Sequence, residues 1–158
     1  MEGGSGRQVA AHVVVIPFPA RGHVNPMLQM AVRLAEEDGI SVTFVRSEAD
    51  ARLMKKEEEE IVAWAGAGSI RFVEIPDGLA PDVDRSTYVL ELCKSAIASM
   101  GPHFHSLIGR LMTMEEEDGR RPTCILADMR LAHIKRWLEL YIRGNHSRGA
   151  NAWMAIFL

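Results

Sequence analysis

The sequence predicts an α/β fold built on a doubly wound, mainly parallel, Rossmann-like sheet. Strand-like and helix-like segments alternate along the chain. The first strand-like segment, His12 to Phe18, is continuously apolar rather than alternating, which is typical of a strand covered on both faces. The first strand, the next helix and the second strand span about 35 residues, the length of one right-handed crossover unit.

The first helix is predicted from its end signals and its apolar spacing. Asn25 is a suitable N-cap, Pro26 suits the first helical position because its missing N–H costs nothing there, and Gly39 can end the helix. Apolar side chains recur at intervals of three and four residues, which gives one buried stripe. Further strands are predicted at 40–46, 70–75 and 123–128.

The segments between these strands have helical patterns. One helix is predicted over 47–60, with a charged end at Lys55 to Glu60 that we expect to face solvent. Two more are predicted at Ser86 to Met100 and Pro102 to Glu117, divided because a proline disfavours helical geometry in the residue before it.

Three regions follow from this pattern. Residues 1–11 are expected to be a flexible N-terminus, 12–128 the Rossmann-like domain, and 129–158 a divergent tail. The tail begins with a segment that could form a basic amphipathic helix and ends in an apolar heptamer, which is either a fifth strand or a surface that must be covered. An alternating α/β pattern that stops in this way indicates part of a larger protein.

Composition narrows the classes of function. The 158 residues are 47% apolar and 25% charged with a net charge of −3, which is ordinary for one globular domain and indicates no nucleic-acid partner. No segment approaches the ~20 apolar residues of a membrane span, so no membrane partner is expected. Two distant cysteines and no signal-peptide pattern favour a cytoplasmic location.

The expected sheet topology brings two distant polar residues together. Doubly wound sheets commonly have the strand order 3-2-1-4, and ligands bind where the first and fourth strands diverge. His23 follows the first strand and Asp128 ends the fourth. A carboxylate that holds one ring nitrogen of a histidine leaves the other nitrogen able to accept a proton from a hydroxyl group. This pair is therefore a candidate general base, although many histidines in such loops are structural.

A wider pattern around His23 resembles a known family. Pro17, Pro19, Gly22, His23 and Pro26 follow an apolar strand and precede a helix, as in the N-terminal signature of plant family-1 UDP-sugar-dependent glycosyltransferases. The stretches "IRFVEIPDGLAPD" and "TCILAD" resemble the family's third strand with its loop and the strand that carries its aspartate. The resemblance covers about residues 10 to 128.

The resemblance implies the N-terminal half of a GT-B fold, which holds mainly the acceptor. It implies that His23 deprotonates an acceptor hydroxyl, that Asp128 orients His23, and that Pro19 and Gly22 shape the acceptor loop. Transfer then inverts the sugar's anomeric carbon with no metal and no cofactor, the UDP-sugar being a co-substrate. The implied partner is a small acceptor such as a phenolic, flavonoid, terpenoid or hormone.

The sequence also departs from the family. The residues after Asp128 match poorly, and the C-terminal donor motif is absent, so we expect a truncated or alternatively spliced product, or a gene-model error, that is inactive alone. A non-catalytic module that binds small molecules or regulates a relative stays an alternative. A dehydrogenase domain is disfavoured because "PARGHVNP" has one glycine where GxGxxG needs three, and no P-loop lysine follows the strand. His103 and His105 face different directions on a helix, which disfavours a metal site.

Overall fold

The computed structural model describes residues 11–65, 69–113, 121–131 and 154–157. They form one five-stranded sheet in the order β3-β2-β1-β4-β5, and all four strand pairs are parallel. The doubly wound sheet and the order of its first four strands are thus confirmed. The strands are β1 (Ala11–Ile16), β2 (Ile40–Ser47), β3 (Ile70–Ile75), β4 (Cys124–Ala127) and β5 (Met154–Phe157).

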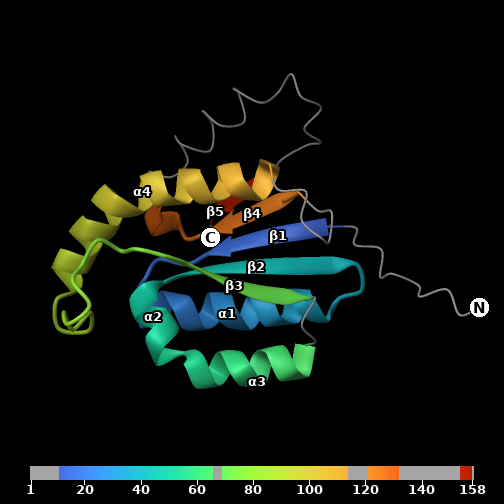
Figure 1. Cartoon of the computed structure of the whole chain (residues 1–158), viewed down its shortest axis with the longest axis horizontal. Coiled ribbons are helices and arrows are strands. Elements are labelled where there is room, and N and C mark those ends of the chain that lie inside the picture. The colour runs from blue at the N-terminus through green and yellow to red at the C-terminus, as the bar shows by residue number, and fades with distance from the viewer. Residues whose placement is uncertain (1–10, 66–68, 114–120, 132–153, 158) are drawn as a thin grey trace, which may run out of the picture.

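Helices cover both faces of the sheet. Figure 1 shows α4 on one side of the strands and α1 and α3 on the other. No helix in the described part of the chain has both the length and the apolar character that a membrane span needs. The helices are α1 (Arg21–Glu36), α2 (Glu48–Leu53), α3 (Lys55–Ala65) and α4 (Val89–Thr113), followed by a short 3-10 helix (Met129–Leu131).

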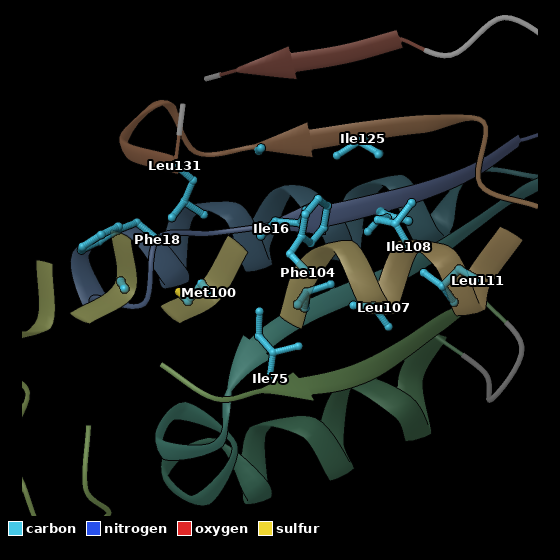
Figure 2. Close-up of a cluster of buried hydrophobic side chains, with 14 of the residues drawn as sticks. Ile16, Phe18, Ile75, Met100, Phe104, Leu107, Ile108, Leu111, Ile125 and Leu131 are labelled. Atoms are coloured by element: carbon cyan, nitrogen blue, oxygen red, sulfur yellow. The ribbon is translucent and has the colours of Figure 1, made fainter. Parts of the chain in front are cut away.

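The two faces of β1 carry separate hydrophobic cores because successive side chains of a strand point in opposite directions. Val13 and Val15 pack toward α1, whereas Val14 and Ile16 pack toward α4. Figure 2 shows how α4 meets the second set, with Phe104 beside Ile16. Burial on both faces explains why β1 is a continuous apolar run.

The helix α1 begins at Arg21, so the predicted start at Asn25 and Pro26 is wrong. The carbonyl of Ala20 accepts hydrogen bonds from the backbone N–H groups of His23 (2.8 Å) and Val24 (2.9 Å), which forms the first turn before the proline. Pro26 then lies inside the helix, where its missing N–H leaves the carbonyl of Gly22 without its usual partner four residues on.

The predicted division of α4 at Gly101-Pro102 is also wrong, because one continuous helix runs through it. Pro102 is exposed, and so is Ala98, whose carbonyl loses its helical partner. Water can therefore hydrate that carbonyl. The apolar stripe on the other side continues without a break from Met100 to Phe104 and holds the two halves together.

After β2, the sequence predicts one helix over 47–60, but the structure has two helices, α2 and α3. The chain turns at Met54, whose side chain is fully buried, and α3 begins at the next residue. The charged start of α3 is largely exposed as predicted, but Glu58 pairs with the buried guanidinium of Arg46. The predicted basic helix of the tail lies mostly outside the described residues. The terminal apolar segment provides β5, which pairs with β4.

Candidate functional site at the carboxyl ends of β1 and β4

The carboxyl ends of β1 and β4 lie side by side. Ile16 pairs with Ala127 in the parallel register, and the backbone N–H of Asp128 donates to the carbonyl of Ile16 at 2.9 Å. Asp128 therefore sits where the fourth strand ends against the first. The loop after β1 turns at Phe18 to Ala20 and leads directly into α1.

The structure brings His23 and Asp128 together although 105 residues separate them. Nδ1 of His23 lies 2.7 Å from Oδ2 of Asp128, which is hydrogen-bonding distance. The other carboxylate oxygen, Oδ1, accepts from the backbone N–H of Arg130 at 2.8 Å. With both oxygens engaged and its side chain only 8% exposed, Asp128 is held in one orientation.

The imidazole ring of His23 is fixed on a second side. The ring of Phe18 meets it edge to face, with the ring centroids 5.5 Å apart. The side chain of His23 is 34% exposed, and no described residue forms a hydrogen bond with Nε2. When Nδ1–H donates to Asp128, Nε2 carries the lone pair, so the accessible nitrogen is the one that can accept a proton.

A cavity of ≈ 510 Å³ is lined in part by the residues that immediately precede His23. Residues 19–22 around the start of α1 line the cavity, together with residues between 49 and 53 in α2 and residues between 81 and 89 in the loop before α4 and at its first position. Pro19 and Gly22 both line the cavity, whereas His23 and Asp128 do not. The cavity therefore reaches Gly22, the residue that precedes His23 in α1.

Gly22 is not required by the packing of the chain itself. A Cβ atom at this position would have no neighbour within 4 Å, and the backbone has no positive φ here. The space beside Gly22 opens into the cavity. This agrees with a close approach of a bound molecule, but the predicted acceptor roles of Gly22 and Pro19 stay predictions.

The outer wall of the cavity is built around Arg85, which sequence reasoning missed. Its guanidinium forms two hydrogen bonds to the buried carboxylate of Asp77, each 3.0 Å long. It also donates to the carbonyls of Leu79, Ala80 and Val83. The hydrogen bonds with Asp77 raise the pKa of Arg85. The residues of this loop form no motif with a fixed spacing, because most of the groups that accept hydrogen bonds from Arg85 are backbone carbonyls.

Two aspartates in the cavity lining were also missed. Burial raises the pKa of Asp50, which is only 5% exposed. Hydrogen bonds from Ser86 and Thr87 lower the pKa of the exposed Asp84 to about 2. The spacing of Ser47 and Asp50 matches a helix-capping pattern and could have indicated that Asp50 is structured.

The described residues contain no cluster of three or more histidine, cysteine, aspartate or glutamate side chains that could hold a metal ion. His103 and His105 lie two residues apart on α4, where His103 is exposed and His105 is partly buried. Cys93 and Cys124 are free thiols in the described structure, and burial raises the pKa of Cys124.

Comparison with known proteins agrees with the sequence signature. The family described as "Glycosyltransferase, N-terminal domain" matches residues 8–77. The chain is 39% identical over 118 residues to (R)-mandelonitrile beta-glucosyltransferase from Prunus dulcis. It is 35% identical over 119 residues to 7-deoxyloganetin glucosyltransferase from Catharanthus roseus. Each match covers 74% of this chain but only 24% of the relative, so the chain spans about a quarter of the relatives' length.

Solved structures support the fold. UGT89C1 from Arabidopsis thaliana, complexed with UDP-L-rhamnose, matches with a TM-score of 0.59 at 20% identity, over 85% of this chain and 33% of that one. Os79 from O. sativa, in complex with UDP, matches with a TM-score of 0.57 at 24% identity, over 90% of this chain and 28% of that one. At such identities these matches show the fold alone. Together with the sequence matches, they show that this chain carries the N-terminal region of a plant family-1 UDP-glycosyltransferase, with the Rossmann-like N-terminal half of a GT-B fold.

Proposed function

We propose that this chain supplies the acceptor side of a UDP-sugar-dependent hexosyl transfer, with His23 as the general base. The observation that carries the proposal is the 2.7 Å contact between Oδ2 of Asp128 and Nδ1 of His23, which lies one residue along α1 from Gly22 in the lining of a cavity. The acceptor is a small molecule with a reactive hydroxyl group, such as a phenolic, flavonoid, terpenoid or hormone. The UDP-sugar is a co-substrate, and the proposed reaction uses no metal ion and no cofactor.

The proposed step moves one proton and one glycosyl group. Nε2 of His23 accepts the proton of the acceptor hydroxyl while the acceptor oxygen attacks the anomeric carbon of the sugar. The bond from that carbon to the β-phosphate oxygen breaks, and UDP leaves with the bonding electron pair. Attack from the side opposite to UDP inverts the anomeric centre.

Asp128 contributes through His23. Its carboxylate fixes the tautomer in which Nε2 is unprotonated and stabilises the imidazolium that forms when Nε2 takes the proton. The buried position of Asp128 and the hydrogen bond from Arg130 N–H keep the carboxylate in place before the acceptor arrives. Both features support a positioning role for Asp128 rather than direct contact with the acceptor.

A matched pair of variants tests the proposal. The chain is joined after Asp128 to the remaining C-terminal part of the Prunus dulcis relative, and transfer from UDP-glucose to a phenolic acceptor is measured. In this fusion, His23→Ala should abolish transfer. Asp128→Asn should lower kcat by about 10³-fold or more, because an amide can hold the wrong tautomer. Acceptor binding should be kept in both variants, and full transfer by His23→Ala would refute the assignment.

A second candidate function is the binding of acceptor-like molecules without transfer. The observation that favours it is that the described residues alone line a cavity of ≈ 510 Å³. Such a chain could regulate a full-length relative by competing for its acceptor. Binding of the acceptor without any transfer, in the fusion as well as in the chain alone, would favour this function.

A further inference from the structure

Asp50 is an unusual member of the cavity lining. It lies in the first turn of α2 and is 5% exposed, whereas Asp84, the other aspartate of the lining, is exposed. A buried carboxylate has two oxygens that can together accept about four hydrogen bonds. Burial without enough partners costs free energy, so the partners of each oxygen need to be accounted for.

Within the described part of the chain, one oxygen of Asp50 has a hydrogen-bond partner and the other has none. Oδ2 accepts from the hydroxyl of Ser47 at 2.8 Å, and no described residue donates a hydrogen bond to Oδ1. Oδ1 of Asp50 is not one of the solvent-inaccessible side-chain atoms that lack a hydrogen-bond partner in the described part of the chain. Oδ1 therefore keeps some accessible surface, and Asp50 is one of the residues that line the cavity.

The other residues that line the cavity indicate which kind of ligand group could donate a hydrogen bond to Oδ1 of Asp50. Apolar or small residues such as Pro19, Ala49, Leu53 and Val83 form much of the wall, which suits a flat or compact apolar body. The lining also contains three arginines against two aspartates, which disfavours a cationic ligand. A neutral hydroxyl group is then the best-matched donor for Oδ1.

We propose that Asp50 is a specificity-determining residue that accepts a hydrogen bond from a second hydroxyl group of the acceptor, so that the site selects polyhydroxylated over monohydroxylated acceptors. This proposal rests on the proposed function, since the same molecule presents its reactive hydroxyl to His23. The raised pKa of Asp50 agrees with a carboxyl group that lacks partners in the empty cavity.

Two rigid probes of nearly equal shape test the preference. 2,7-Dihydroxynaphthalene carries two hydroxyl groups, and 7-methyl-2-naphthol replaces one of them by a methyl group. Their binding to the 158-residue chain is measured by isothermal titration calorimetry. We expect the dihydroxy probe to bind about tenfold more tightly, because hydrogen bonds to charged groups are stronger than neutral ones. In Asp50→Ala this preference should disappear through weaker binding of the dihydroxy probe alone. In Asp50→Asn, part of it should remain.

Two controls separate recognition from a structural role. Ser47→Ala removes the cap of α2 but keeps the Asp50 carboxylate, so it should lower the melting temperature and retain the preference. Glu36→Gln removes an exposed carboxylate at the far end of α1 and should change neither quantity.

The outcomes distinguish this inference from the proposed function. Equal binding of both probes to the wild-type chain would overturn the role of Asp50 and leave acceptor binding standing. An equal loss of affinity for both probes in Asp50→Ala would also overturn it, since a structural defect acts on both. Failure of the wild-type chain to bind either probe would overturn the acceptor-binding assignment of the cavity as well.

Discussion

Asp50 and Asp84 line the same cavity but ionise differently because their surroundings differ. Asp84 is exposed and accepts hydrogen bonds from the backbone N–H of Ser86 and from two hydroxyl groups, which favour its charged form. Asp50 is buried with one hydroxyl donor, and desolvation raises its pKa despite that donor and the nearby arginines. Ionisation of Asp50 therefore destabilises the folded protein when no ligand is bound in the cavity.

The raised pKa of Asp50 gives a pH-dependent prediction. A group whose pKa is higher in the folded state binds its proton more tightly there, so its contribution to stability is greatest below the unfolded-state pKa of 3.8. That contribution is lost as the pH rises from 3.8 through the folded-state pKa. The free energy of unfolding of the wild type relative to Asp50→Asn should therefore fall between pH 3.5 and 7.

Urea unfolding of both proteins across this range provides the measurement. The difference between the two proteins cancels the titration of the groups that they share. A difference that rises with pH would contradict burial as the dominant influence on Asp50. It would indicate instead that the nearby arginines stabilise the charged form in the folded protein.

At the scale of elements, the sequence allowed the strands and their order to be predicted, because strand burial leaves a strong local pattern. The continuous apolar run of β1 comes from burial on both faces, and crossover handedness then limits the topology. Helix ends were less predictable. Pro26 and Pro102 both lie inside helices because tertiary burial of the apolar stripe outweighs one lost hydrogen bond.

The candidate site could be predicted only in part, for a similar reason. His23 and Asp128 follow strand ends, so topology alone places them near each other. The cavity walls depend on a loop whose shape is set by Arg85 and Asp77 through contacts with backbone carbonyls. Backbone contacts of this kind leave no residue pattern at fixed spacing.

The loop before α4 depends on a glycine. Gly78 has φ = 87°, and a Cβ there would lie 2.3 Å from Oγ of Ser99 and 2.4 Å from Oγ of Ser95 on α4. Gly78→Ala should destabilise the protein by about 1–3 kcal/mol through the left-handed backbone, with the steric contacts adding to this. Because the loop forms one wall of the cavity, affinity for 2,7-dihydroxynaphthalene should fall as well.

The matched control is Gly22→Ala. This glycine lies in α1 without a positive φ and without neighbours for a Cβ, so alanine should stabilise the helix by about 0.5–1 kcal/mol. If a bound acceptor approaches Gly22 closely, the same change should weaken probe binding. Thermal unfolding and calorimetry of the two variants check both expectations. Equal stability of Gly78→Ala and the wild type would show that the loop adjusts freely.

On the scale of the whole molecule, the candidate catalytic residues and the cavity lie at the carboxyl ends of the parallel strands. The chain passes from β1 into α1 on one face of the sheet, whereas α4, the helix that precedes β4, covers the other face. His23, Asp128 and the cavity all lie at this end, and the loops that form the cavity lie there too (Figure 1). The described residues thus place the proposed base and the cavity at the same end of one sheet.

Glycosyl transfer also requires that the acceptor and the sugar nucleotide are held close together. The acceptor oxygen must approach the anomeric carbon to within about 3–3.5 Å, and the sugar nucleotide must be held while its phosphate bond breaks. The family resemblance assigns that task to the C-terminal domain. We therefore expect the 158-residue chain to bind phenolic probes but to form no glucoside from UDP-glucose.

Chromatography of overnight reactions, with UDP release measured in parallel, tests this expectation, and the active fusion with the donor half serves as the positive control. Glucoside formation by the chain alone that disappears in His23→Ala would contradict the expected division of labour. It would mean that the 158-residue chain binds both the acceptor and UDP-glucose. Glucoside formation that persists in His23→Ala would instead point to a contaminating enzyme, because the only base proposed for the reaction would be missing.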